Sequence, residues 1–304
     1  MTNKQNPDKP DIHQRFLFEN YDIRGEIVSL STSVREVYQR GDYPAAVQVL
    51  LGQFMAASCL LSANLKFNGV ITLQANGNGP IPLIMADCSR NHHLRAIARF
   101  AEIDDGSEPS QAVDLEGNFQ QLVGKGHLAI TVQPENGERY QGIVPLEHAE
   151  LSDCLTEYFS YSQQLATRVW LSSDSQGASG LLLQTLPSQL QSSEERDLSW
   201  EHLCQLSDTL SKDEQLALHH SEQLHRLFHQ DSVRLFEETP RQFACSCSQT
   251  RLSQALVSLG RDEAMDILRE QPNIEITCEF CNHHYLFHPE DINALFDGNG
   301  PIIH

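Results

Sequence analysis

FACSC (residues 243–247) and ITCEFC (residues 276–281) decide how the C-terminal part of this chain folds. They contain two close cysteine pairs, Cys245 with Cys247 and Cys278 with Cys281. Each pair is short enough to place both sulfurs on one metal ion, and two pairs supply the four thiolates that tetrahedral zinc prefers. We therefore predict a zinc site made by these four cysteines. Because four protein ligands leave no coordination position for water, the pattern argues against a catalytic zinc.

The residues around the two pairs predict a small domain. Leu252–Leu268 has the spacing of two short helices that Gly260 separates. His283 and His284 follow the second pair and are expected to be surface residues rather than ligands. A tail of about sixty residues buries little apolar surface, whereas structural zinc contributes on the order of 10–16 kcal/mol to the folding of such modules. Removing the metal should therefore unfold the tail.

The spacing of the cysteines leaves two roles open for the predicted site. Most four-cysteine zinc sites are inert structural staples, and the spacing taken alone favours that role. The alternative is a redox switch, because thiolates are nucleophiles and their oxidation to disulfides removes the metal ligands. The other cysteines, Cys59, Cys88, Cys154 and Cys204, occur singly and are expected to be small core residues.

The charge of the chain limits its partners and its location. The 304 residues carry a formal net charge of -20, which repels phosphate backbones and anionic membranes, so neither nucleic acid nor a membrane is expected as a partner. The polar N-terminus, MTNKQNPDKPDIHQ, lacks the apolar core of a secretory signal, so we expect a cytoplasmic protein with reduced cysteines. Polar residues interrupt the apolar stretch 45–65, which predicts a buried helix rather than a membrane span.

The pattern of residues 1–188 predicts an α+β domain with a largely antiparallel sheet. Asn136-Gly137 lies between two β-rich runs and predicts a hairpin, because both residues tolerate positive φ. We expect an extended opening segment at 16–28, helices near 31–40, 43–61 and 151–163, and strands near 66–75, 81–87, 127–133, 139–144, 169–172 and 180–186.

Residues 189–240 are predicted to form a helical linker between this domain and a C-terminal zinc domain, 241–304. Leucines recur at helical spacing from Leu198 to Leu210 and again from Leu216 to Leu227, and Glu237–Pro240 should end the helical region. Helices with apolar stripes and a charged remainder are marginal unless they are docked. The linker histidines are expected on solvated helix faces; they are His202, His219, His220, His225 and His229.

Over nearly its whole length, the chain resembles the 33-kDa chaperonin family, the redox-regulated heat-shock holdases of bacteria. The cysteine motifs CSC (245–247) and CEFC (278–281) at this separation near the C-terminus are the most specific part of the resemblance. The other matching stretches are LFEN (17–20), RGE (24–26), LKF (65–67), GERYQG (137–142) and HYLF (284–287).

The resemblance implies a chaperone that is not an enzyme and that is inactive while it is reduced and zinc-bound. Under oxidative stress, disulfides Cys245–Cys247 and Cys278–Cys281 would form, zinc would leave, and the tail and linker would unfold. The active form would be a homodimer that binds unfolding client proteins without ATP, with 1–188 serving client binding and dimerisation. The sequence contains no GxxxxGK[ST] phosphate loop, which agrees with independence from ATP. Apolar stripes of a loosened linker could bind clients, while the acidic remainder keeps the complexes soluble.

Two other functions are compatible with a Cys-rich tail. A structural zinc-ribbon adaptor for nucleic acid or protein predicts basic residues around the metal, whereas residues 245–281 contain three arginines and six carboxylates. A thiol-disulfide oxidoreductase using Cys278 and Cys281 would need its C-x-x-C at the start of a helix in a strand-helix-strand setting.

Overall fold

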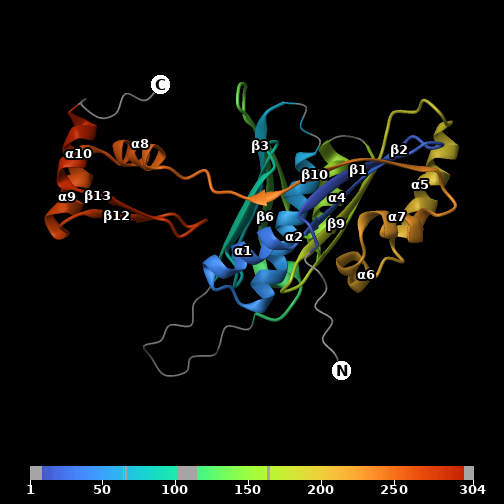
Figure 1. Ribbon diagram of the computed structural model, residues 1–304, viewed down its shortest axis with the longest axis horizontal. Coiled ribbons are helices and arrows are strands. Elements are labelled where there is room, and N and C mark those ends of the chain that lie inside the picture. The colour runs from blue at the N-terminus through green and yellow to red at the C-terminus, as the bar shows by residue number, and fades with distance from the viewer. Residues whose placement is uncertain (1–8, 64, 66, 101–114, 163–164, 298–304) are drawn as a thin grey trace. The chain divides into compact units, whose positions relative to one another are not determined.

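The computed structural model describes residues 9–63, 65, 67–100, 115–162 and 165–297. The chain forms two compact units, Met1–Ala244 and Cys245–His304. Figure 1 shows the elements of each unit along the chain. The predicted linker, 189–240, lies within the first unit, and the second unit begins four residues after the predicted start of the zinc domain.

One half of the first unit is a five-stranded antiparallel sheet of order β10-β1-β2-β9-β8. Its strands are β1 (Ile12–Phe18), β2 (Ile23–Leu30), β8 (Thr167–Ser173), β9 (Ala178–Thr185) and β10 (Val233–Pro240). Every residue of β9 is buried, because both faces of this sheet are covered.

The other half is a six-stranded sheet of order β11-β5-β4-β3-β6-β7. Its strands are β3 (Gly69–Gly77), β4 (Leu83–Ser89), β5 (His93–Arg99), β6 (Gly126–Pro134), β7 (Tyr140–Pro145) and β11 (Gln242–Phe243). All pairs are antiparallel except β11 with β5. The predicted hairpin at Asn136-Gly137 is confirmed as β6–β7, and Gly137 has a φ of 138°. The expected strand 66–75 corresponds to β3, although Lys66 lies outside the described residues.

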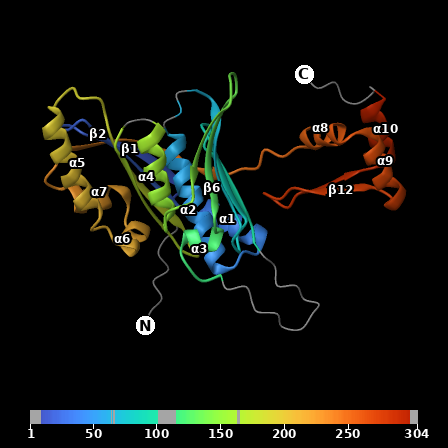
Figure 2. The ribbon, with the colours of Figure 1, turned by 180° about the vertical axis from the view of Figure 1, so that it is seen from behind.

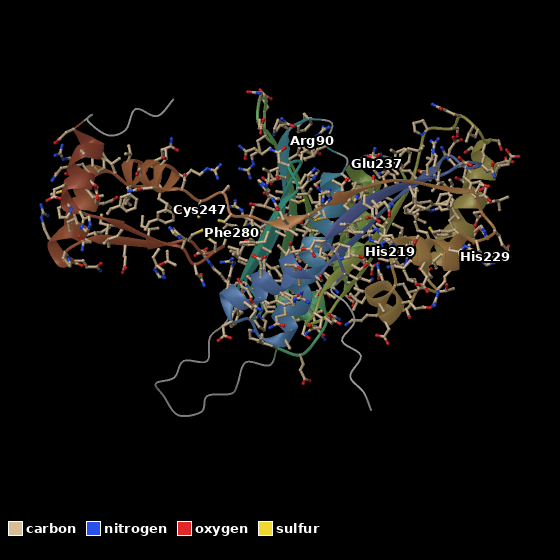
Figure 3. All side chains as sticks on the ribbon, viewed as in Figure 1. Arg90, His219, His229, Glu237, Cys247 and Phe280 are labelled. Atoms are coloured by element: carbon tan, nitrogen blue, oxygen red, sulfur yellow. The ribbon has the colours of Figure 1, made fainter. Side chains whose placement is uncertain are left out.

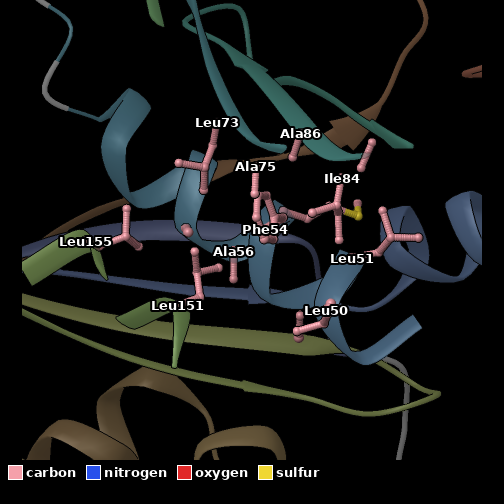
Figure 4. Packing of buried hydrophobic residues seen from close by; sticks show 14 of the residues in the cluster. Leu50, Leu51, Phe54, Ala56, Leu73, Ala75, Ile84, Ala86, Leu151 and Leu155 are labelled. Atoms are coloured by element: carbon pink, nitrogen blue, oxygen red, sulfur yellow. The ribbon is translucent and has the colours of Figure 1, made fainter. Parts of the chain in front are cut away.

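Helix α2 (Ala45–Ser62) lies between the two sheets and contacts strands of both. Figure 4 shows its Leu51 and Phe54 packed among residues of β3 and β4 such as Leu73 and Ile84. The other helices of this region are α1 (Thr32–Gly41), α3 (Phe119–Val123) and α4 (Leu151–Ser162). Among the described residues, α2 is the one helix long and apolar enough to span a membrane, and 72% of it is buried inside the protein. That burial matches the expectation of a core helix.

Three linker helices cover the outer face of the five-stranded sheet, as Figure 2 shows. They are α5 (Ser193–Ser207), α6 (Lys212–Ala217) and α7 (His220–Phe228). Capping boxes begin the first two: Ser192 pairs with Glu195, and Ser211 pairs with Glu214. The predicted end of the helical region is instead a strand, because 233–240 pairs with β1 as β10. Pro240 is tolerated there because β10 is an edge strand.

The second unit is a small α/β module around a two-stranded sheet. Its elements are α8 (Gln249–Leu259), α9 (Arg261–Glu270), β12 (Ile274–Thr277), β13 (His284–Phe287) and α10 (Pro289–Phe296). Gly260 separates α8 from α9 with a φ of 105°, as the sequence predicted. Among the described residues of this unit, the buried apolar core consists of Leu256, Ala264, Ile274, Phe287 and Ile292.

Candidate metal centre

The cysteines of the second unit lie on two irregular segments. Cys245 and Cys247 precede α8, whose first turn is capped by Ser248. Cys278 and Cys281 occupy the turn between β12 and β13, and Figure 3 labels Cys247 and Phe280 on the two segments. In that turn the amide of Asn282 donates a hydrogen bond to the Cys278 carbonyl at 2.8 Å, with Asn282 at a φ of 56°. Asparagine tolerates this left-handed conformation, which lets the turn close around both sulfurs.

The fold brings all four predicted sulfurs together. Their Sγ atoms lie within 4.8 Å of one another, and no histidine belongs to this cluster of potential ligands within the described chain. The Sγ atoms of Cys245 and Cys278 are 3.6 Å apart, and those of Cys247 and Cys281 are 3.4 Å apart. Four thiolates at the usual zinc–sulfur distance would be about 3.8 Å apart in a tetrahedron. The four cysteines can therefore hold a metal ion, and their distances and sulfur chemistry fit zinc.

The thiols of Cys245, Cys247 and Cys281 differ in acidity. Burial works against ionisation of Cys247, but hydrogen bonds from Tyr285 and the other thiols lower its pKa to about 7. Burial and hydrogen bonding within the cluster raise the pKa of Cys281 to about 12, and burial also raises the pKa of Cys245. The Cys247 thiolate therefore forms easily, whereas the Cys245 and Cys281 thiols resist ionisation. A cation at the centre would favour thiolates at every position.

Two side chains outside the cysteine set hold the site in place. The Tyr285 hydroxyl donates a hydrogen bond to the Cys247 sulfur at 3.2 Å, and this contact raises the pKa of Tyr285 to about 12. Arg251 donates to the carbonyl and hydroxyl of Ser246, at 3.0 and 2.7 Å, between the first two cysteines. No sequence pattern assigned a role to Tyr285, so this contact was not predicted. The alternation of side chains after the C-x-x-C turn could have indicated it. Tyr285 and His283 are two positions apart, so their side chains point to the same face.

The histidines beside the second pair are exposed, as expected. His284 bonds Thr277 Oγ1 through Nδ1 at 3.0 Å, and the His283 ring packs on Tyr285 at 4.5 Å between centroids. The oxidoreductase alternative required C-x-x-C at the start of a helix. Instead, Cys278 and Cys281 lie in a β-hairpin turn, which lacks the helix N-terminus that lowers a nucleophilic cysteine's pKa.

The linker covers an apolar sheet face in the first unit. The ring of Phe16 in β1 packs tilted against Phe228 of α7 at 6.3 Å between centroids, and the ring of Phe18 packs edge-on against Phe228 at 5.0 Å. The remaining buried members of this cluster are Ile23, Ile27, Leu181, Leu183, Leu203, Leu224 and Leu227. Each such side chain contributes roughly 1.5–3 kcal/mol when fully buried. The sheet therefore presents a large apolar surface whenever the linker is undocked.

Polar contacts fix the linker to the same sheet. His220 Nε2 lies 3.0 Å from Ser29 Oγ, and the Ser172 hydroxyl donates to Gln215 Oε1 at 2.7 Å. Burial lowers the pKa of His220 to about 3, so the ring is neutral. The expectation of a solvated histidine is wrong for His220, which is fully buried, because its partner lies on a strand distant in sequence. The other linker histidines are exposed, including His219 and His229 in Figure 3.

The comparisons with known proteins agree along nearly the whole chain. The family model described as Hsp33 protein matches residues 11–288. Proteins named 33 kDa chaperonin from Pseudomonas fluorescens and Pseudomonas savastanoi pv. phaseolicola are 46% and 47% identical over 292 residues, covering 95% of this chain and 95% of each relative. The crystal structure of a 33 kDa chaperonin from Thermotoga maritima matches with a TM-score of 0.78 at 21% identity, covering 95% of this chain and 98% of that one, which shows a shared fold.

Proposed function

The chain belongs to the Hsp33 family of chaperones, and from this premise we propose that it is a redox-regulated holdase of the cytoplasm. In the proposed cycle, the reduced, zinc-bound form is inactive and oxidation activates it. The single observation that carries the proposal is the gathering of four half-buried cysteines within 4.8 Å, in a unit with a very small core.

Zinc held by Cys245, Cys247, Cys278 and Cys281 would supply the cross-link that the second unit needs. Five buried apolar residues form its core in the part that the structure describes, which is little for a module of this size. Structural zinc contributes on the order of 10–16 kcal/mol in comparable modules. Loss of the metal is therefore expected to unfold this unit.

Oxidation removes the ligands. For each cysteine pair, a peroxide accepts two electrons and an S–S bond forms. The two peroxide oxygens take up two protons and leave as two water molecules. A disulfide sulfur carries no negative charge and is a poor metal ligand, so two disulfides abolish the site. We propose the pairs Cys245–Cys247 and Cys278–Cys281 on the family resemblance. The sulfurs of Cys245–Cys278 and Cys247–Cys281 are also close, so peptide mapping must decide the pairing.

Activation then requires an apolar surface for clients. The linker helices bury one such surface against β1, β2 and β9. We propose that unfolding of the second unit loosens the linker, uncovers this face, and lets it bind unfolding proteins without ATP. The net charge of -20 would keep client complexes soluble, and the active form is expected to be a homodimer.

The test is suppression of client aggregation. A thermally unfolding client is mixed with reduced, zinc-loaded protein or with protein treated with peroxide at mild heat, both without ATP. We expect protection only from the oxidised sample, whose sedimentation should also show a dimer. Equal protection by both samples would remove the switch from the proposal and leave a chaperone with a structural metal site.

A further inference from the structure

Two cysteines that do not belong to the metal centre meet inside the first unit. Cys59 is on α2 and Cys88 is on β4, yet their Sγ atoms are 3.6 Å apart. Both side chains are fully buried in the main apolar core. Their sequence positions predict two separate core residues, because Cys88 follows Cys59 by 29 positions and neither belongs to a motif. The fold thus creates a dithiol that the sequence does not reveal.

Hydrogen bonds order the two thiols. The Cys88 thiol donates to Ser62 Oγ at 3.1 Å, and the Ser62 hydroxyl donates to the Cys59 carbonyl at 2.8 Å. The Cys59 thiol is therefore left to donate to Cys88. That hydrogen bond lowers the pKa of Cys88 to about 7, whereas burial raises the pKa of Cys59. Cys88 is consequently the better nucleophile of the pair.

The other two buried cysteines, Cys154 and Cys204, have no thiol partner in the described part of the chain and are less acidic than Cys88. Burial raises the pKa of Cys154 and of Cys204 to about 11. Neither has a sulfur partner within hydrogen-bonding distance among the described residues. They therefore show how a core cysteine behaves without a second thiol beside it, and Cys154, on α4, is the matched control.

We propose that Cys59 and Cys88 form a second, independent redox site, which peroxide converts to a disulfide between α2 and β4. The Cys88 thiolate attacks the peroxide O–O bond, giving a sulfenic acid and hydroxide. The Cys59 thiol then displaces the hydroxyl from that sulfur and gives up its proton. In sum, two thiols and one peroxide yield one disulfide and two waters. The sulfurs must approach from 3.6 Å to about 2.0 Å.

Burial sets when this site reacts. The thiols of the metal centre are half-buried, whereas Cys59 and Cys88 are reached only when α2 and β4 separate briefly. The core disulfide should therefore form after the tail disulfides and faster at mild heat. It would close a loop between residues 59 and 88 and hold α2 on β4 while the second unit is unfolded. Its role would be to protect the folded core of the oxidised protein.

The experiment uses the full-length, zinc-loaded chain treated with hydrogen peroxide at mild heat. Samples are quenched over time, denatured with an alkylating reagent, digested without reduction and mapped by mass spectrometry. The variants are Cys88→Ser, Cys59→Ser and the control Cys154→Ser. Each cysteine is read on its own peptide, so the core pair and the tail pairs succeed or fail separately.

Wild type and Cys154→Ser should yield a linked peptide joining residues 59 and 88, lighter by two hydrogens, after the tail thiols are lost. Neither Cys59→Ser nor Cys88→Ser should yield it, and oxidised wild type should unfold several degrees above oxidised Cys88→Ser. Full alkylation of both Cys59 and Cys88 in wild type after the tail has oxidised would overturn the proposal. So would a linkage of either residue to Cys154 or Cys204 in place of the pair.

Discussion

Replacing Phe228 by alanine should separate docking of the linker from oxidation of the metal centre. Phe228 is 1% exposed and packs on Phe18 and Phe16, the aromatic centre of the covered sheet face. A buried Phe→Ala change costs about 3–5 kcal/mol, and the loss of two ring contacts places this site near the middle of that range. About 4 kcal/mol corresponds to a thousandfold shift toward the undocked linker.

Hydrogen exchange and client aggregation measure the two consequences in the same reduced, zinc-loaded sample. Amides of α5–α7 in Phe228→Ala should exchange up to about a thousandfold faster than in wild type. The reduced variant should also suppress aggregation without any oxidant. Leu198→Ala is the control, because this linker leucine is 68% exposed and its truncation should cost less than about 0.5 kcal/mol.

One result would refute this reasoning directly. If the linker of reduced Phe228→Ala exchanges much faster but the variant protects the client no better than reduced wild type, then covering the sheet face is not the source of the inactivity proposed for the reduced form. Unchanged exchange would instead contradict the assigned docking energy.

Three further predictions concern acid, the tyrosine beside the metal centre, and the metal. Because the pKa of His220 is lowered to about 3 in the folded protein, its contribution to stability is present above about pH 6.5 and is lost as the pH falls toward 3. In urea titrations, the free energy of unfolding of wild type should fall by up to about 1.4 kcal/mol per pH unit in this range. The same dependence on pH in His220→Gln would contradict this assignment. Tyr285→Phe removes the hydrogen bond to Cys247 and should weaken zinc binding about 10–100-fold in chelator competition. Equal zinc affinity of the variant and wild type would show that this hydrogen bond does not stabilise the bound metal. A strong chelator under reducing conditions should abolish exchange protection in 249–296 while 45–62 stays protected, and retained protection would show that the metal is not needed for folding.

The sequence predicted the elements that depend on local signals. Gly260 ends α8 through its positive φ, and Asn136-Gly137 closes the β6–β7 hairpin. The four cysteines could be assigned to one cluster because C-x-C and C-x-x-C spacing restricts where the sulfurs lie.

Features that depend on distant partners could not be predicted. Strand β10 ends in Glu-Glu-Thr-Pro, which predicts a break, and its strand conformation comes from pairing with β1 at the other end of the chain. Likewise, His220 is buried because α7 packs on β2, where Ser29 is its hydrogen-bond partner, and no pattern within the linker indicates this contact. The Cys59–Cys88 pair exists only because α2 packs on β4.

Metal content and thiol state, measured on one sample before and after peroxide at mild heat, test the central claim most directly. The reduced chain should hold one zinc and four free thiols at Cys245, Cys247, Cys278 and Cys281. After oxidation it should hold no zinc, and these residues should be found in two disulfides. Zinc that stays bound with four free tail thiols would contradict the switch and show a structural staple.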